Sequence, residues 1–212
     1  MSQYRFVGDV HGYWNQYRNV VKDVENSIQV GDMGMGFTSH SEWAPDSALA
    51  FEKKFKEGNH RFIRGNHDNP KEVAKCSKWI NDGFLEITDL GNKIMYIGGA
   101  WSIDWKYRTM GVDIWEDEEL SLAYLTYLIE QYKLIKPDIM VTHTAPIGIP
   151  AGPMGFRILG NGARTELALQ EMLEYHRPKY WIFGHWHKDF DKTIDGTRFI
   201  CLNELSWIDL EI

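Results

Sequence analysis

The chain has 212 residues, of which 43% are hydrophobic and 25% charged, a balance typical of a globular protein with its own apolar core. Its 30 acidic and 23 basic side chains give a net charge of −7, which argues against a protein that binds nucleic acid mainly by neutralising phosphates. No run approaches the roughly 18 apolar residues of a membrane-spanning helix. Composition and length therefore predict a single domain over residues 1–212 and no membrane partner.

The two cysteines, Cys76 and Cys201, show neither metal-binding nor redox spacing. The chain enters a strand-like run at Tyr4 without the apolar core of an export signal. Few cysteines and no export signal are typical of a protein kept in a reducing compartment. We therefore expect a cytoplasmic protein.

The first half of the chain alternates between strand and helix patterns. We expect strands at 4–8, 26–30 and 61–63, with helices at 13–25 and 46–57, the second led by Pro45 and ended by Gly58. Alternation of this kind is typical of parallel strands joined by crossover helices.

The second half mixes parallel and antiparallel signals. We expect strands at 93–98, 138–141 and 179–183, helices at 118–134 and 163–176, and a hairpin over 192–202. Asp195-Gly196 in that hairpin suits the left-handed angles of a two-residue turn. The acidic run Glu116 to Glu119 is expected to cap the helix that follows it. The pattern predicts a mixed sheet, or two packed sheets, with helices outside.

Metal-binding residue types recur where the predicted strands end. They are Asp9, His11, Asp32, Asn66, His67, Asp68, His143, His185 and His187. Loops after parallel strands meet at one edge of a sheet, so we expect these side chains to converge. In Asp-x-His and His-x-His, an extended backbone would project both side chains to the same side, and neighbouring glycines would let the loops approach closely.

The chemistry of these side chains favours a pair of metal ions. Carboxylates, imidazoles and one amide suit first-row divalent ions such as Mn²⁺, Fe²⁺, Zn²⁺ or Co²⁺. Seven ligands are too many for one tetrahedral ion and suit two, which together polarise a phosphoryl group. Each motif alone also occurs as an ordinary turn or as a satisfied core histidine. The interpretation rests on their joint occurrence.

The ordered series GDVHG at 8–12, GD at 31–32, GNHD at 65–68, THTAP at 142–146 and GHWH at 184–187 resembles the calcineurin-like metallophosphoesterase superfamily. Residues 98–119 are similar to a bacterial and phage subgroup. The resemblance implies an α/β fold of two packed mixed β-sheets flanked by helices, a four-layer α/β/β/α sandwich. It also implies hydrolysis of phosphoesters by attack of a metal-bound hydroxide.

The resemblance also implies a role for each site residue. Asp9, His11 and His187 would hold one divalent ion, Asn66, His143 and His185 the other, and Asp32 would bridge the two. His67 would be the general acid that protonates the leaving alkoxide. Mn²⁺ is the first expectation for both ions, with Fe, Zn, Co or Ni as alternatives.

One departure from the protein-phosphatase branch bears on the substrate. That branch reads Gly-Asp-x-x-Asp-Arg-Gly, whereas this chain continues Gly31-Asp32 with Met33 to Gly36, so the branch's histidine-orienting aspartate and phosphate-clamping arginine are absent. Arg108 and Arg157 are candidate substrate clamps, because arginine binds phosphate through two hydrogen bonds.

We expect phosphodiesters or a broad range of small phosphoesters as substrates. The alternatives are a serine/threonine-type phosphoprotein phosphatase, a nuclease, or a non-catalytic metal-binding scaffold. Stable binding of duplex nucleic acid is not expected from so acidic a chain, and the oligomeric state is open. Four tryptophans near the motifs are expected mainly in the core, with base stacking as the alternative: Trp101, Trp105, Trp115 and Trp186.

Overall fold

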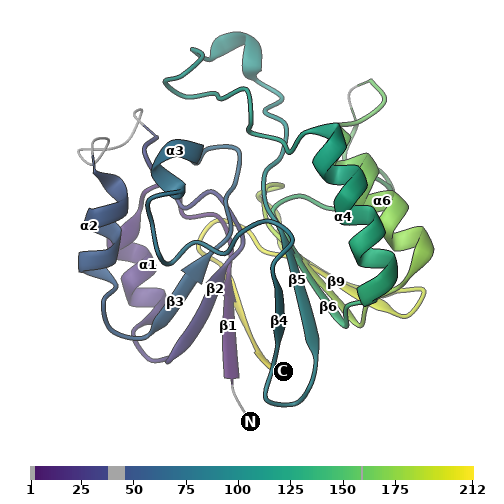
Figure 1. The fold of residues 1–212 in the computed structure, drawn as a ribbon, viewed down its shortest axis with the longest axis horizontal. Coiled ribbons are helices and arrows are strands. Elements are labelled where there is room, and N and C mark those ends of the chain that lie inside the picture. The colour runs from purple at the N-terminus through teal and green to yellow at the C-terminus, as the bar shows by residue number, and fades with distance from the viewer. Residues whose placement is uncertain (1–2, 38–45, 159) are drawn as a thin grey trace.

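The structure is a computed structural model that describes residues 3–37, 46–158 and 160–212 (Figure 1). Its strands are β1 (Gln3–Val7), β2 (Asn26–Gln29), β3 (Asn59–Phe62), β4 (Leu85–Ile87), β5 (Lys93–Ile97), β6 (Ile139–Thr142), β7 (Tyr180–Phe183), β8 (Phe190–Ile194), β9 (Thr197–Cys201) and β10 (Trp207–Glu211). Its helices are α1 (Trp14–Val21), α2 (Ser47–Lys54), α3 (Pro70–Val73), the 3₁₀ turn η1 (Trp105–Tyr107), α4 (Leu122–Ile135), α5 (Gly148–Ala151) and α6 (Arg164–Tyr175). Pro45, expected to lead a helix, lies outside the described residues.

The strands form two mixed sheets. The four-stranded sheet has the order β10-β1-β2-β3, with β1, β2 and β3 parallel and β10 antiparallel to β1. The six-stranded sheet has the order β4-β5-β6-β7-β9-β8, with a parallel centre and antiparallel edges. The parallel strands of each sheet end at the same edge, which brings the loops that follow them together.

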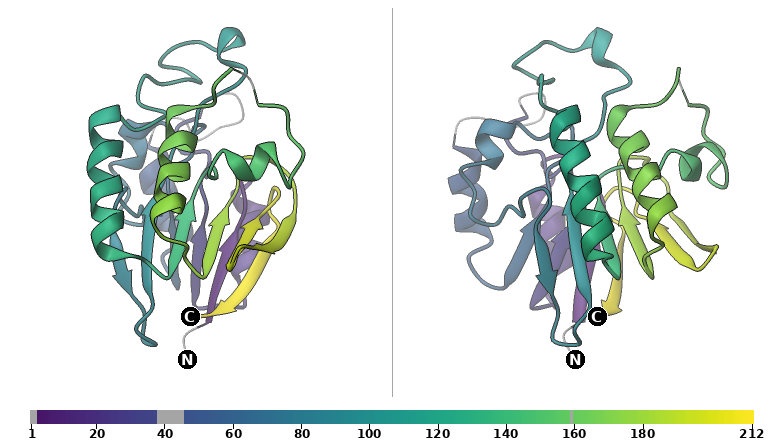
Figure 2. Two further views of the ribbon diagram at one scale, coloured as in Figure 1. Left: turned by 90° about the vertical axis from the view of Figure 1, so that its right-hand side faces the viewer. Right: turned by 45° about the vertical axis from the view of Figure 1, so that its right-hand side comes forward.

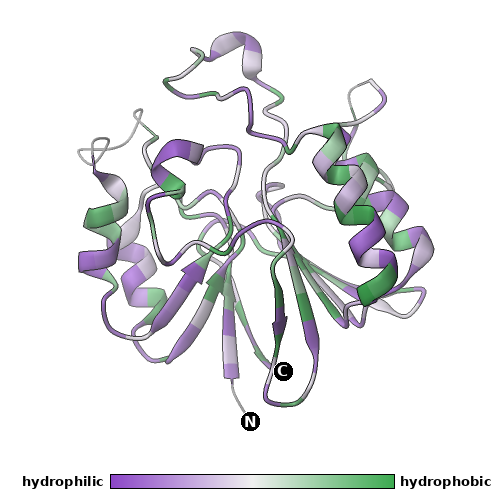
Figure 3. Ribbon diagram, in the orientation of Figure 1, coloured by the Kyte–Doolittle hydropathy of each residue, from purple (hydrophilic) through white to green (hydrophobic). Residues whose placement is uncertain are grey.

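The two sheets face one another, and helices cover their outer faces. In Figure 1, α1 and α2 lie outside the four-stranded sheet, while α4 and α6 lie outside the six-stranded one; Figure 2 shows α4 and α6 side by side. Strand periodicity explains these layers: along β6, Ile139 and Val141 pack between the sheets, while Met140 packs beneath the helices. Hydrophobic residues accordingly recur along the strands in Figure 3. The predicted arrangement of two packed mixed sheets flanked by helices is confirmed.

The expected elements are present, with different ends in several places. Helix α1 stops at Val21 rather than continuing to residue 25, and α2 ends at Lys54 rather than 57. The expected hairpin is β8–β9, and Asp195 and Gly196 both have positive φ, as a two-residue turn requires. The sequence interpretation missed the sheet-edge strands β4 and β10, which are only partly buried. In the described part of the chain, no helix is long and apolar enough to cross a membrane.

The prediction for the acidic run 116–119 is wrong. Helix α4 is instead capped by Ser121, whose side chain accepts a hydrogen bond from Tyr124 N. The carboxylate of Glu119 accepts from Thr165 N at the start of α6, and the carboxylate of Glu118 accepts from both the backbone and the hydroxyl of Ser102. The run therefore joins two other segments, because these carboxylates find buried donors there.

Candidate metal centre

The predicted metal ligands lie on five loops at one edge of the two sheets. The loops follow β1 (Asp9, His11), β2 (Asp32), β3 (Asn66), β6 (His143) and β7 (His185, His187). Because β1–β3 and β6–β7 belong to different sheets, each sheet supplies part of the site. The structure brings all seven side chains together, through the contacts given below.

The loops are more tightly turned than the sequence interpretation assumed. His11, Asp32, His185 and His187 have φ values of 48°, 60°, 66° and 44°, in the left-handed region that non-glycine residues rarely adopt. The extended backbone expected for Asp-x-His and His-x-His is therefore wrong. Conformations of this kind cost of order 1–3 kcal/mol each and persist where the surroundings hold them.

Two glycines are required by close approach of the loops. A Cβ atom at Gly65 would overlap the carboxylate of Asp32, and one at Gly31 would overlap the imidazole of His143. The loops after β2, β3 and β6 can therefore meet only because these positions carry no side chain. The expectation that glycines allow close approach is confirmed at both positions.

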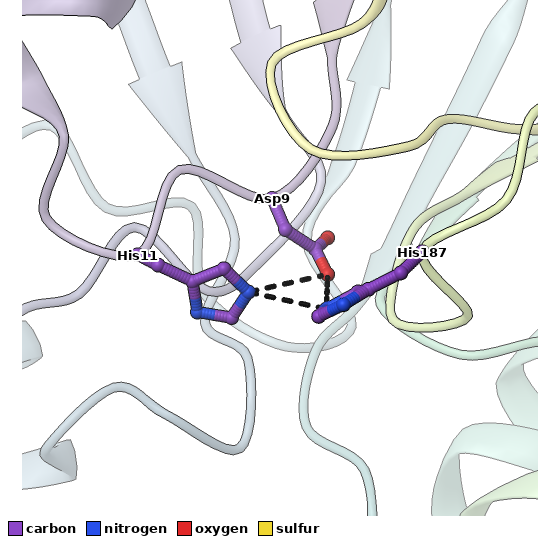
Figure 4. A group of neighbouring side chains, drawn as sticks. All are labelled: Asp9, His11 and His187. Atoms are coloured by element: carbon purple, nitrogen blue, oxygen red, sulfur yellow. Dashed lines mark hydrogen bonds and ion pairs between the residues drawn. The ribbon is translucent and has the colours of Figure 1, made fainter.

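One group of ligands, which we call the open half-site, consists of Asp9, His11 and His187 (Figure 4). His187 Nε2 lies 3.1 Å from Asp9 Oδ2 and 3.1 Å from His11 Nε2. Asp9 is fully buried, whereas the side chain of His187 is 47% exposed. Glu204, which the sequence interpretation did not single out, lies 3.3 Å from the other ring nitrogen of His187.

The second group, which we call the buried half-site, consists of Asn66, His143 and His185, with Asp32 beside them. His143 Nε2 lies 3.0 Å from Asn66 Oδ1 and 3.3 Å from Asp32 Oδ1. The ring of His185 meets that of His143 edge-on at 5.1 Å. Asp32 also connects the two half-sites, because its Oδ2 lies 4.0 Å from His11 Nδ1.

Hydrogen bonds orient the ligands of the buried half-site. His143 Nδ1 donates to Val30 O at 2.9 Å, which leaves Nε2 as an acceptor in the neutral ring. Asn66 Nδ2 donates to Ser102 Oγ, and that hydroxyl in turn donates to Glu118, so Asn66 Oδ1 faces His143. Asn66 Oδ1, Asp32 Oδ1 and His143 Nε2 therefore converge, and a divalent cation that displaces the proton of His143 Nε2 fits this donor set.

The charges in the buried half-site perturb one another. Burial raises the pKa of Asp32, but the imidazoles of His143, His67 and His11 outweigh it and hold that pKa well below its usual range. Burial lowers the pKa of His143, yet Asp32 raises it to about 9. Burial, together with His143, lowers the pKa of His185 to about 3. Perturbation of this size is typical of functional sites.

His67, the predicted general acid, lies beside these ligands. Its backbone N donates to Asp32 Oδ1 at 2.8 Å, and its Nε2 lies 4.0 Å from Asp32 Oδ2. The ring packs 4.8 Å from that of Phe37. Burial lowers the pKa of His67, and the Arg108 guanidinium lowers it further, against the opposing effect of Asp32.

The two candidate substrate arginines differ in how they are held. Arg108 Nη2 donates to His67 Nε2 at 3.1 Å, and the same guanidinium makes two hydrogen bonds to Asp104, of 2.6 and 2.8 Å. Arg157 is exposed and lines the same cavity as His67. The structure thus brings Arg108 to the site and Arg157 to its rim.

Several supporting residues were missed from the sequence. Asp68 is buried and accepts hydrogen bonds from the backbone N atoms of Met33, Gly34, Met35 and Gly65, which ties the loop after β2 to the loop after β3. Its place in the GNHD motif could have signalled this role. Ser102, Glu118, Asp104 and Glu204 gave no such signal, because they lie outside the motifs and only folding brings them near the ligands.

Residues outside the motifs have mostly structural partners. His60 is buried against Ser27, and His176 contacts the carbonyl oxygen of Pro137, while His40 lies outside the described residues. Among the four tryptophans, Trp115 is buried as expected and Trp105 is exposed. The other two, Trp101 and Trp186, line the cavity at the site.

The chain is similar to known proteins in sequence and in fold. The sequence profile of the family described as calcineurin-like phosphoesterase matches residues 4–189. A UPF0046 protein of Caenorhabditis elegans is 36% identical over 94 residues; the match covers 42% of this chain and only 22% of the length of the worm protein.

Two solved structures share the fold. A dimetal phosphatase from Danio rerio aligns over 97% of this chain and 88% of its own, with a TM-score of 0.59 and 14% identity. The phosphopantetheinyl hydrolase of Mycobacterium tuberculosis aligns over 96% of this chain and 90% of its own, with a TM-score of 0.56 and 13% identity. At these identities the two likenesses show the fold alone.

Proposed function

The chain belongs to the calcineurin-like phosphoesterase family, and from this membership we propose that it is a metal-dependent hydrolase, which uses two divalent ions to hydrolyse phosphodiesters or a broad range of small phosphoesters. The observation that carries the proposal is the convergence of Asp32 Oδ1, Asn66 Oδ1 and His143 Nε2 next to the open half-site. Such a concentration of lone pairs is stable only with bound cations or protons.

The two half-sites define which residues would hold each ion. Asp9, His11 and His187 would hold one, and Asn66, His143 and His185 the other, with Asp32 shared between them. Two bound ions would neutralise charge on the non-bridging phosphoryl oxygens and lower the pKa of a water molecule towards neutrality. Mn²⁺ is our first choice for both, since the donor set is oxygen and nitrogen without thiolate.

His67 is the proposed general acid for the leaving oxygen. Arginine can only donate, so the Arg108 contact makes His67 Nε2 an acceptor in the resting site. A phosphoryl oxygen that binds Arg108 would take over this hydrogen bond, and the freed Nε2 could then take up a proton from solvent and donate it to the leaving oxygen. Arg108 is thus the proposed phosphate clamp, and Asp104 holds its guanidinium in place. Arg157, at the rim, is a second candidate clamp.

The preference for diesters rests on two features. The second motif lacks the Asp-Arg pair of the phosphoprotein phosphatases, and a cavity of about 600 Å³ beside His67 leaves room for a second ester group.

The test is turnover of a bis-aryl phosphate against the corresponding mono-aryl phosphate with added Mn²⁺. We expect the diester to have the higher kcat/KM. A clear preference for the monoester would overturn the diester preference, and no turnover of either ester with any divalent ion would overturn the proposed activity.

A further inference from the structure

The cavity beside the metal centre extends well beyond the ligands. Its volume is about 600 Å³, and it is lined at one side by Asn66 and His67 and elsewhere by Ala163 and Glu166 at the start of α6. Five of the other side chains that line it are apolar or aromatic (Trp101, Ile103, Phe156, Ile158 and Trp186), and polar or charged side chains, among them Asp104, Arg108 and Arg157, line the rest. The phosphoryl chemistry proposed above uses none of these five side chains.

Two segments that are far apart in the sequence build the walls. Trp101 and Ile103 belong to residues 98–119, which we call the arm, the segment that carries η1 and projects beyond the helices at the top of Figure 1. Phe156 and Ile158 come from the connection between α5 and α6. Ile103 is 69% exposed although it stands next to a charged site. Apolar side chains left open beside such a site are typical of a ligand-binding surface.

Phe156 is held in its place in the wall. Its ring packs 4.9 Å from that of Trp186, at an angle of 48°. Trp186 is itself fixed, because its indole N donates to Thr144 Oγ1 at 3.2 Å. The cavity therefore offers an anchored aromatic surface, on which flat rings stack irrespective of their substituents.

Glu166 supplies a hydrogen-bond acceptor to the same cavity. It is buried, and its Oε2 accepts from Ala163 N at 3.2 Å, the only donor it meets among the residues that the structure describes. Burial raises its pKa to about 7. A buried carboxyl group with unused acceptor positions favours a ligand that brings its own N–H donor.

We propose that this cavity binds the second ester group of a phosphodiester and selects a flat ring that carries an N–H donor, as a nucleobase does. The inference rests on the proposed function and names the substrate class of the same site. The apolar and aromatic side chains of the wall, Phe156 and Trp186 above all, suit a flat ring. Arg108 and His67 at the metal end would hold the phosphoryl group, so the ring extends towards Glu166.

The test compares three p-nitrophenyl phosphodiesters with the same leaving group. Their second groups are methyl, phenyl and thymidin-5′-yl, and only thymine adds an N–H donor to a ring. We expect kcat/KM to rise by about tenfold from methyl to phenyl and to rise again for the thymidine ester, as stacking of one ring contributes a factor of about 5 to 150. Equal kcat/KM for all three would overturn the inference while the proposed function stands. If none of the three diesters is hydrolysed, both the inference and the proposed function are overturned.

Variants locate the effect in the cavity. Phe156→Ala, and the exposed Ile103→Ala as a variant that keeps the core intact, should lower the phenyl-to-methyl ratio of kcat/KM by about three- to tenfold. Glu166→Ala should lower the thymidine-to-phenyl ratio, and Glu166→Gln, which keeps an acceptor oxygen, should restore it. Tyr127→Ala, an exposed aromatic on α4 outside the cavity, should change neither ratio. Unchanged ratios in the cavity variants would contradict the inference.

Discussion

The two half-sites of the metal centre are built in different ways. In the buried half-site, the side chains of His143 and Asp32 are 0% and 1% exposed, and Val30, Ser102 and Glu118 orient the ligands. In the open half-site, the side chain of His187 is 47% exposed and its neighbour Glu204 is 48% exposed. Since fixed ligands lose less entropy on binding, we expect the buried half-site to hold its ion more tightly.

The largest effect is expected for Asp32→Asn, because Asp32 is the residue shared by both half-sites. Loss of its charge should lower the affinity for both ions and reduce turnover by more than about 10⁴-fold, since each ion contributes several kcal/mol to the rate. Metal content and diester hydrolysis check this together. Asp191→Asn, a surface carboxylate paired with Arg198, is the control. A variant at position 32 that keeps both ions and a tenth of the activity would show that the half-sites are independent.

His67→Ala separates the reaction from metal binding. His67 contacts Asp32 mainly through its backbone N, which the substitution keeps. Both ions should therefore remain, while turnover falls by about 10²–10⁴-fold, the usual contribution of a positioned acid. An unchanged rate would remove His67 from the mechanism, and loss of metal would make it a ligand instead.

Ser102→Ala tests the support of the buried half-site alone. Without the hydroxyl, the amide of Asn66 loses its partner, and the tighter metal affinity should fall by about 10–100-fold. The metal affinity of the open half-site should stay within about twofold of its value in the unchanged protein, because that half-site does not contact Ser102. Ser77→Ala at an exposed position is the matched control. Equal losses in both affinities would contradict the division into half-sites.

Glu204→Gln should have the smallest effect. Solvent screens this half-exposed carboxylate. Loss of its charge should therefore lower only the affinity of the open half-site for its ion, by about threefold. Calorimetric titration of Mn²⁺ into the variant measures both affinities. A larger loss than that of Ser102→Ala would reverse the proposed ranking of the half-sites.

The sequence was sufficient to predict which side chains converge but not what holds them in place. Asp9, Asp32 and His143 lie within three residues of a strand end, so the strand pattern predicted where they would lie. The Ser102–Glu118 support joins the arm to the loop after β3, and nothing in the spacing of residues 66, 102 and 118 indicates that contact. The acidic run was misassigned for a related reason, since its buried donors on other segments are visible only after folding.

The left-handed backbone at His11 and His187 was also unpredictable, because local preference opposes it and the fold overrides that preference. The assignments of ligand roles, the single domain and the narrower similarity of the arm to bacterial and phage proteins stay predictions.

The central claim is a two-ion centre, and the most direct measurement is the Mn²⁺ stoichiometry of the metal-depleted chain, by calorimetric titration with elemental analysis of the dialysed product. The account predicts two ions per chain, bound in two steps of different affinity, with the weaker step lost first on chelation. Fewer than two ions at saturating Mn²⁺ would contradict it.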